Sequence, residues 1–198
     1  MDGKKDVLGI WIGEAEGAKF WLKVCTELQN RGVKDILIAC IDGLKALPDA
    51  IRMVFPKVEI QLCIIHMIRN SIKYVPHNHS KEFMTDLKEV YRATTEELAY
   101  QNLERLQRKW ELKYALAVRP WFTHWDNLKT FFAFPEQIRT MIYTTNAVES
   151  VHRQLRKVTK NKAVFPTDES LVKMLFLAIR DVSKKWTMPM RGWKTIIS

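Results

Sequence analysis

Two acidic residues, Asp42 and Glu149, lie at positions where their carboxylates can bind a metal ion together with a substrate phosphate. Asp42 follows the apolar run 35–41 and precedes Gly43, and the carboxyl end of a buried strand is where open α/β sheets present side chains to a crevice. Glu149 lies far along the chain, in a stretch with helical spacing. Two such carboxylates can ligate Mg²⁺, which takes carboxylate and substrate phosphate oxygens together. The plainer interpretation of Asp42-Gly43 is a turn.

The helix expected over residues 146–160 aligns cations with the second carboxylate. Its charged face carries Glu149, Arg153, Arg156 and Lys160, with Lys157 beside it. Its apolar face carries Val148, Val151, Leu155 and Val158. One interpretation is a solvated face on which Glu149 only pairs with Arg153, an interaction worth a few tenths of a kcal/mol. The functional interpretation is a metal ligand, Glu149, with the four cations binding backbone phosphates.

Cys63 and His66 have the spacing of half a zinc site, which His77 and His79 can complete. The two later histidines sit in a polar Pro-His-Asn-His segment without the usual ligand spacing, so we expect no structural zinc. We favour a different role for the first two residues. His66, at the end of the strand that follows Asp42, is predicted to lie near the catalytic centre with Cys63 and to support a metal ligand or contact a substrate phosphate.

Three tryptophans fall in the middle of the chain. Trp110, Trp121 and Trp125 can stack on an unpaired or flipped base. Such residues are more often the core of a helical bundle, and we favour that interpretation. Trp125, beside His124 and Asp126, is the exception we expect.

The first third of the chain alternates predicted strands and helices. Strands are expected at 7–13, at 35–41 as a strand buried on both faces, and at 58–65. Helices are expected at 15–32, ended by Gly32, and through Leu47, Ile51 and Val54, closed by Pro56. This order predicts an α/β layer with parallel neighbouring strands.

The rest of the chain is predicted to be helical. Charged residues alternate with large apolar ones at three- and four-residue intervals over 67–141, and helices follow at 146–160 and 168–185, the last with Asp168 as its N-cap. The predicted organisation is an α/β part at 1–66, a helical insertion at 67–141, and C-terminal core helices at 142–198 that carry Glu149.

Composition limits the class of protein. The net charge of +10 favours a polyanionic partner, above all nucleic acid. Cys25, Cys40 and Cys63 are odd in number and widely spaced, which indicates reduced thiols. No apolar run approaches the roughly 20 residues needed to cross a bilayer, and no signal peptide is present, so we expect a soluble cytoplasmic protein without a membrane partner.

Three separated motifs resemble one known family. They are Asp-Gly-Leu-Lys-Ala-Leu-Pro at 42–48, Cys-Ile-Ile-His-Met-Ile-Arg-Asn at 63–70, and Tyr-Thr-Thr-Asn-Ala-Val-Glu-Ser at 143–150 with Arg-Gln-Leu-Arg at 153–156. In this order they resemble the Mutator-type transposases of bacterial insertion sequences. The segments 7–9, 13–14 and 184–186, and Trp193, are similar to the same family.

The resemblance implies a DDE nuclease with an RNase H-like α/β core and an α-helical insertion. Asp42 matches the second catalytic aspartate and Glu149 the catalytic glutamate, and together with a first aspartate they would hold two Mg²⁺ or Mn²⁺ ions. The implied partners are transposon ends and target DNA, with a homo-oligomer as the active complex, associated with the bacterial nucleoid. The first aspartate has no match here. Asp2 and Asp6 flank a turn, and the family's N-terminal DNA-binding region is absent, so the chain resembles a C-terminal part.

Three functions follow from these residues. The first is DNA transposition, with metal-dependent cleavage and strand transfer in the family and no activity expected of this chain alone. The second is a catalytically inactive DNA-binding remnant that inhibits the full-length transposase. The third is an α/β enzyme of another class that uses Asp42 and His66 as an acid/base pair, which would not need the cations after Glu149.

Overall fold

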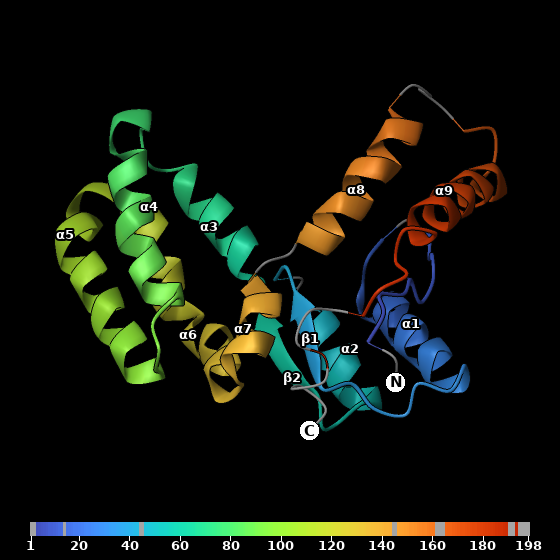
Figure 1. Ribbon diagram of the computed structural model, residues 1–198, viewed down its shortest axis with the longest axis horizontal. Coiled ribbons are helices and arrows are strands. Elements are labelled where there is room, and N and C mark those ends of the chain that lie inside the picture. The colour runs from blue at the N-terminus through green and yellow to red at the C-terminus, as the bar shows by residue number, and fades with distance from the viewer. Residues whose placement is uncertain are drawn as a thin grey trace.

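The computed structural model describes residues 3–13, 15–43, 46–143, 146–160, 165–189 and Trp193, and for 146–150 the backbone alone. The first elements are α1 (Ala18–Asn30), β1 (Ile38–Ile41), α2 (Leu47–Val54), β2 (Glu59–Leu62) and α3 (Ile64–Ile72). They are followed by α4 (His77–Tyr91), α5 (Glu96–Thr123), α6 (Trp125–Leu128), the 3₁₀ helix η1 (Lys129–Ala133), α7 (Glu136–Tyr143), α8 (Asn146–Thr159) and α9 (Asp168–Ser183). The sheet lies between two groups of helices, with α1 and α2 on one side and α3 to α5 on the other (Figure 1).

The two strands are parallel and in register from Ile38 opposite Glu59 to Ile41 opposite Leu62. α2 makes the crossover between them, and Phe55 ends it by donating its backbone N–H to the Ile51 carbonyl at 2.7 Å. The predicted order of strand, helix and strand from residue 35 to residue 62 is confirmed. Parallel strands require such a crossover because their ends lie at opposite edges of the sheet.

α1 ends as its sequence predicts. Gly32 has φ +100° and donates its N–H to the Gln29 carbonyl at 2.9 Å, while Val33 donates to the Leu28 carbonyl at 3.1 Å. This pair of bonds is the Schellman motif, which needs a left-handed residue and therefore favours glycine. Leu28 and Val33 also pack against the core.

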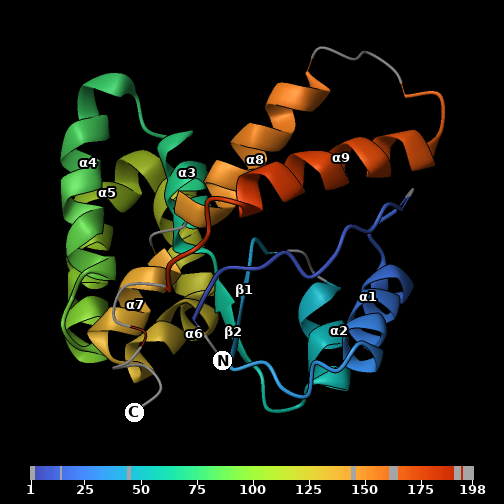
Figure 2. The ribbon, with the colours of Figure 1, turned by 45° about the vertical axis from the view of Figure 1, so that its right-hand side comes forward.

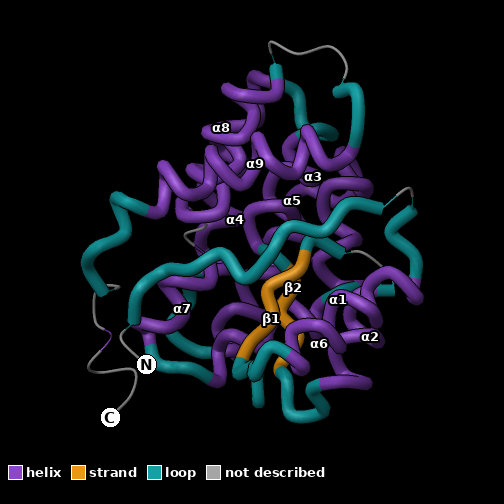
Figure 3. The backbone as a smooth tube through the Cα atoms, turned by 90° about the vertical axis from the view of Figure 1, so that its right-hand side faces the viewer, coloured by secondary structure: helices purple, strands orange, loops and turns teal. Residues whose placement is uncertain are grey.

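The predicted strand at 7–13 is wrong, because the structure has a loop there (Figure 3). Among the described residues the sheet has two strands, and this segment pairs with neither. Instead, the Trp11 indole N–H donates to a Glu27 carboxylate oxygen of α1 at 2.8 Å. An apolar run becomes a strand only where a neighbouring strand accepts its backbone hydrogen bonds.

Three boundary predictions also need correction. β1 is not buried on both faces, since Leu37 beside it is 63% exposed and Cys40 within it is exposed. The strand predicted at 58–65 ends at Leu62, and α3 begins at Ile64 because Ile64 and Ile68, one helical turn apart, are the residues that enter the core. The N-cap of α9 is Thr167, whose hydroxyl accepts from the Ser170 N–H in a capping box, rather than Asp168.

The helical prediction over 67–141 is confirmed, and these helices share one core with the sheet. Buried residues run without a break from Ile41 and Ile60 of the strands to Phe83 of α4 and Leu103 of α5. Figure 2 shows α4 and α5 side by side. α5 is kinked, with a non-helical backbone at Tyr114 and a proline, Pro120, inside the helix.

α8 and α9 pack against each other, and both lie apart from α4 and α5 (Figure 1). No residue of α9 is buried within the part of the chain that the structure describes, and Phe176 is 55% exposed. None of the described helices combines the length and the apolar character that crossing a membrane requires. The thiols of Cys25, Cys40 and Cys63 are free, and burial raises the pKa of the Cys25 thiol.

Candidate functional site

Asp42 lies directly after β1, exposed, on the wall of a cleft of about 640 Å³. β1 places it there because Ile41, the last residue of the strand, is buried and directs the chain out of the sheet at this point. The prediction that Asp42 faces a crevice at the carboxyl end of a strand is therefore confirmed. An exposed carboxylate at such a position is free to bind a cation or a substrate group.

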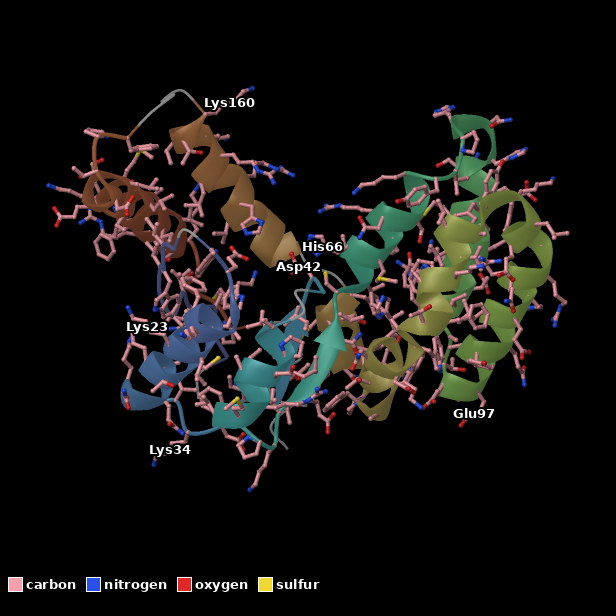
Figure 4. All side chains as sticks on the ribbon, turned by 180° about the vertical axis from the view of Figure 1, so that it is seen from behind. Lys23, Lys34, Asp42, His66, Glu97 and Lys160 are labelled. Carbon is pink, nitrogen blue, oxygen red and sulfur yellow. The ribbon has the colours of Figure 1, made fainter. Side chains whose placement is uncertain are left out.

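The first turn of α3 brings Cys63 and His66 to the same cleft. The Cys63 N–H donates to the Ile41 carbonyl at 2.7 Å, so α3 starts beside the end of β1. Figure 4 shows Asp42 and His66 close together at this end of the sheet. His66 is on a helix, not at the end of a strand as predicted, but it is near Asp42 as expected.

His66 has one feature that the sequence did not predict. Its Nδ1 atom is buried, and no described residue is a hydrogen-bond partner for it. A buried polar atom without a partner costs free energy, about 1–3 kcal/mol. The rest of the imidazole is half-buried and lines the cleft, so the ring is placed to contact a group that enters it.

The helical insertion supplies the opposite wall. Pro120 and His124 at the end of α5, and Asn127 of α6, line the same cleft as Asp42. The sequence marked His124 only as a neighbour of Trp125. No local sequence pattern could have predicted this wall. Its residues follow His66 by more than 50 positions in sequence, and they reach the cleft because α5 runs back towards the sheet.

Two buried hydrogen bonds hold the walls at a fixed separation. The Ser71 hydroxyl of α3 donates to the Ala117 carbonyl of α5 at 2.9 Å. The Trp121 indole N–H donates to the same hydroxyl at 2.8 Å. Ser71 and Trp121 are almost fully buried, so these bonds are shielded from water.

The cations of α8 are exposed as predicted, over the part of the helix whose side chains are described. Exposed residues are Arg153, Arg156, Lys157 and Lys160, and half-buried residues are Val151, Leu155 and Val158. Lys160 lies at the end of α8 remote from Asp42 (Figure 4). The side chain of Glu149 is outside the described residues, so its expected convergence with Asp42 to within roughly 10 Å stays a prediction.

The described side chains fit a hard divalent cation in part. Asp42 is the one carboxylate among the residues that line the described cleft, and Mg²⁺ binds through one or two carboxylates plus substrate oxygens. No group of three His, Cys, Asp or Glu residues able to hold a metal occurs in the described ranges. His79 does not join Cys63 and His66, because its Nδ1 atom bonds to the Tyr114 hydroxyl beside Trp110.

Trp110 and Trp121 are core residues, 3% and 1% exposed, as expected. The Trp110 indole N–H donates to the Asp86 carboxylate at 2.7 Å. Trp125 is half-buried, and its ring meets that of Tyr100 edge-on at 5.4 Å between centroids. It is therefore more accessible than the other two, as predicted, but it packs within the insertion.

Comparison with known proteins identifies relatives of this chain. The family model described as "Transposase, Mutator family" matches residues 1–189. The transposase for insertion sequence element ISRM3 of Rhizobium meliloti is 42% identical over 193 residues, which cover 97% of this chain and 48% of that protein. A probable insertion-sequence transposase of Corynebacterium diphtheriae is 42% identical over 187 residues, 93% of this chain and 54% of that protein.

A more distant relative, the transposase for IS905 of Lactococcus lactis, is 34% identical over 184 residues, which cover 93% of this chain and 47% of its own length. The chain thus spans about half the length of the curated relatives it matches. The matched region contains the cleft, with Asp42, and the basic helix α8. The chain belongs to the Mutator family of transposases.

Proposed function

We propose that this chain forms part of the catalytic centre of an enzyme that cuts and joins insertion-sequence DNA. The observation that carries the proposal is the cleft in which Asp42, exposed at the end of a parallel strand, lies with the unpartnered Nδ1 atom of His66. Relatives that match nearly the whole chain are named as insertion-sequence transposases, which supports DNA as the substrate.

Asp42 and Glu149 would hold Mg²⁺ or Mn²⁺, which supplies Lewis acidity at the phosphate that undergoes substitution. His66 would contact a phosphate oxygen of the substrate through the part of its imidazole that lines the cleft. Cys63 is a positioning residue, because its backbone N–H fixes the start of α3 against β1. The third candidate, an acid/base pair of Asp42 and His66 in another class of enzyme, does not account for the match to transposases.

The reaction is a phosphoryl transfer with no covalent protein intermediate. A water molecule or a DNA 3′-hydroxyl gives up its proton to solvent and attacks phosphorus in line. The bond from phosphorus to the leaving 3′ oxygen breaks, and that oxygen takes up a proton from solvent. The residues of the cleft hold the attacked phosphate, while Arg153, Arg156, Lys157 and Lys160 neutralise flanking backbone phosphates. Contacts of this kind carry no sequence information, so sequence specificity would come from elsewhere in the full transposase.

We propose an RNase H-like fold in which further strands pair with the outer edge of β1. The far edge of β2 is already covered by the insertion, since the Thr130 hydroxyl donates to the Ile60 carbonyl at 3.1 Å and the Phe131 N–H to the Gln61 side chain at 2.8 Å. Within the described ranges β1 pairs only with β2. A strand added at that edge would place its own aspartate near Asp42 and supply the missing carboxylate.

A DNA cleavage and strand-transfer assay tests this proposal. The 198-residue chain is compared with a chimaera that joins to it the part of the ISRM3 transposase that it does not match, each with Mg²⁺ or Mn²⁺ and DNA bearing insertion-sequence ends. We expect no cleavage by the chain alone, since two carboxylates hold two hydrated Mg²⁺ ions poorly, and cleavage by the chimaera. Asp42→Asn in the chimaera should abolish cleavage and leave the fold intact. Strand transfer by the chain alone would contradict the proposed incomplete site.

A second function, DNA binding without cleavage, is favoured by two observations together: the cations of α8 are exposed, and the described lining of the cleft has a single carboxylate. Such a chain would occupy transposon ends or join an oligomer of the full transposase and inhibit it. Adding the purified chain to an active chimaera separates the two functions. A fall in strand transfer as the chain is titrated, without cleavage by the chain itself, would establish inhibition.

A further inference from the structure

The cleft continues beyond Asp42 along one face of α3. His66, Asn70 and Lys73 line it at intervals of four and three residues, so they share that face, and Tyr74 follows at its end. The Lys73 ammonium donates to the Asn70 side-chain oxygen at 2.9 Å. Asn70, Lys73 and Tyr74 are exposed and take no part in the core. A row of polar and aromatic side chains therefore leads away from the Asp42 site.

The insertion faces this row from the other side. His124 and Asn127 are the polar residues of that wall, and Leu116 and Pro120 are its apolar ones. The floor is closed where Ser71 bonds to Ala117 and Trp121, so α3 and α5 cannot separate without breaking buried hydrogen bonds. The cleft is thus a groove of fixed width with donors on both walls.

The volume of the groove and the charges of its lining side chains indicate which kind of ligand it binds. Its volume of about 640 Å³ is that of a site for a small ligand, which is room for one or two nucleotides. Past Asp42, the described lining side chains include a lysine, two histidines, two amides and a tyrosine, and no second carboxylate. Cationic grooves with exposed rings are the usual sites for unpaired strands, because phosphates bind the cations and bases stack on the rings.

We propose that the groove between α3 and the α5–α6 junction binds the unpaired DNA strand that enters the Asp42 site. Lys73 binds a backbone phosphate, and Tyr74 and His124 contact the base that follows it. The inference rests on the proposed function for the identity of the substrate. It assigns to the insertion a direct part in holding the strand that is cut.

Fluorescence anisotropy on the full chain tests the inference, with a labelled single strand of thymidines and a duplex as separate probes, in EDTA so that metal binding does not contribute. We expect Lys73→Ala, Tyr74→Ala and His124→Ala each to weaken binding of the single strand about tenfold, and binding of the duplex less than about twofold. Tyr74→Phe should restore binding because it keeps the ring. Lys73→Ala should also lower the dependence on salt by about one phosphate contact.

Lys113→Ala is the matched control, because Lys113 is an exposed lysine of α5 outside the groove. Circular dichroism melting of each variant checks that it folds. The inference is overturned if the groove variants bind the single strand as the original chain does, or if Lys113→Ala weakens binding equally. Competition by polyglutamate as effective as by the single strand would also overturn it, and would point to an acidic protein partner.

The triple variant Arg153→Ala, Arg156→Ala and Lys160→Ala separates this inference from the proposed function. If that variant loses duplex binding while the groove variants lose nothing, the groove assignment fails and DNA binding through α8 stands. If the unsubstituted chain binds neither probe, both fail.

Discussion

At the scale of single residues, the polar side chain of Gln61 attaches the insertion to the sheet. It is fully buried in β2, and its amide donates to the Leu128 carbonyl at 3.1 Å and accepts from the Phe131 N–H at 2.8 Å. These bonds attach the insertion to the edge of the sheet. A polar residue inside a core is tolerated when its hydrogen bonds are all made, as they are here.

Replacing Gln61 with leucine should therefore destabilise the chain by about 2 kcal/mol, because a buried N–H and a buried carbonyl lose their partner. Urea unfolding measures the change in the free energy of unfolding. Gln101→Leu, at an exposed position of α5, is the matched control and should change it by less than about 0.5 kcal/mol. Equal stability of the two variants would show that the amide does not lock the insertion to the sheet.

A second residue, Asp86, joins α4 to α5. It accepts from the buried Trp110 indole at 2.7 Å and from Lys109 at 2.6 Å, whereas the more exposed Glu82 contacts Lys109 alone. Asp86→Ala should cost about 2 kcal/mol, and Glu82→Ala less than about 0.5 kcal/mol. The measurement is urea unfolding of both variants. Equal costs would contradict the assignment of the indole bond as the stabilising contact.

The difference in the free energy of unfolding between these two variants depends on pH through the titration of Lys109. The hydrogen bonds that Lys109 donates to Asp86 and, to a smaller extent, to Glu82 raise the pKa of Lys109 above its ordinary value. Because the pKa of Lys109 is higher in the folded chain, the stabilisation is complete at pH values below the ordinary lysine pKa. It is lost only as the pH rises through the pKa of Lys109 in the folded chain. The cost of Asp86→Ala should therefore be constant from about pH 6 to about pH 9.

At the scale of elements, the start of α9 shows how a helix end is set by geometry. Thr167 has extended backbone dihedral angles and its hydroxyl accepts from the Ser170 N–H at 3.2 Å, while Asp168 is the first helical residue. Asp168 is then placed to interact with the helix dipole, a weaker effect than the cap.

We expect Thr167→Ala to weaken the first turn of α9 by about 1 kcal/mol and Asp168→Ala to weaken it by less. Hydrogen exchange of the α9 amides is the suitable measurement, because α9 has no buried residue among those described and can unfold locally. A larger loss of hydrogen-exchange protection in Asp168→Ala than in Thr167→Ala would show that Asp168 is the N-cap, as the sequence analysis predicted.

At the scale of the whole molecule, exposed cations lie along α8, and Lys160 lies at the end of this helix remote from Asp42 (Figure 4). The chain carries a net charge of +10. Arg153, Arg156 and Lys160 are exposed along α8. Exposed cations release counterions when they meet a phosphate backbone.

The triple alanine variant of these cations should weaken binding of unrelated DNA sequences to a similar degree and reduce the salt dependence by up to about three phosphate contacts. The measurement is duplex affinity across a range of salt concentrations. A matched control replaces the exposed lysines of α4 and α5, Lys81, Lys88 and Lys113. An unchanged salt slope in the α8 variant would identify the helix as a solvated face.

The sequence by itself determined the local elements and the family. Helical spacing predicted the insertion and α8, Gly32 predicted the end of α1, and the run before Asp42 predicted a strand with a carboxylate at its end. These features depend on neighbouring residues, so periodicity and turn chemistry are sufficient to find them. The three ordered motifs were enough to identify the family because their spacing and residue types are specific.

Only the tertiary structure decided which segments pair and which residues share the cleft. The run at 7–13 has the composition of a strand, but it has no partner among the described residues. Ile64 and Ile65 continue the apolar pattern of β2 in the sequence, but in the structure they belong to α3, in which Ile64 is buried. His124 and Asn127 reach the Asp42 cleft only because Ser71 and Trp121 dock α5 on α3. Such contacts join residues remote in sequence, and no local pattern encodes them.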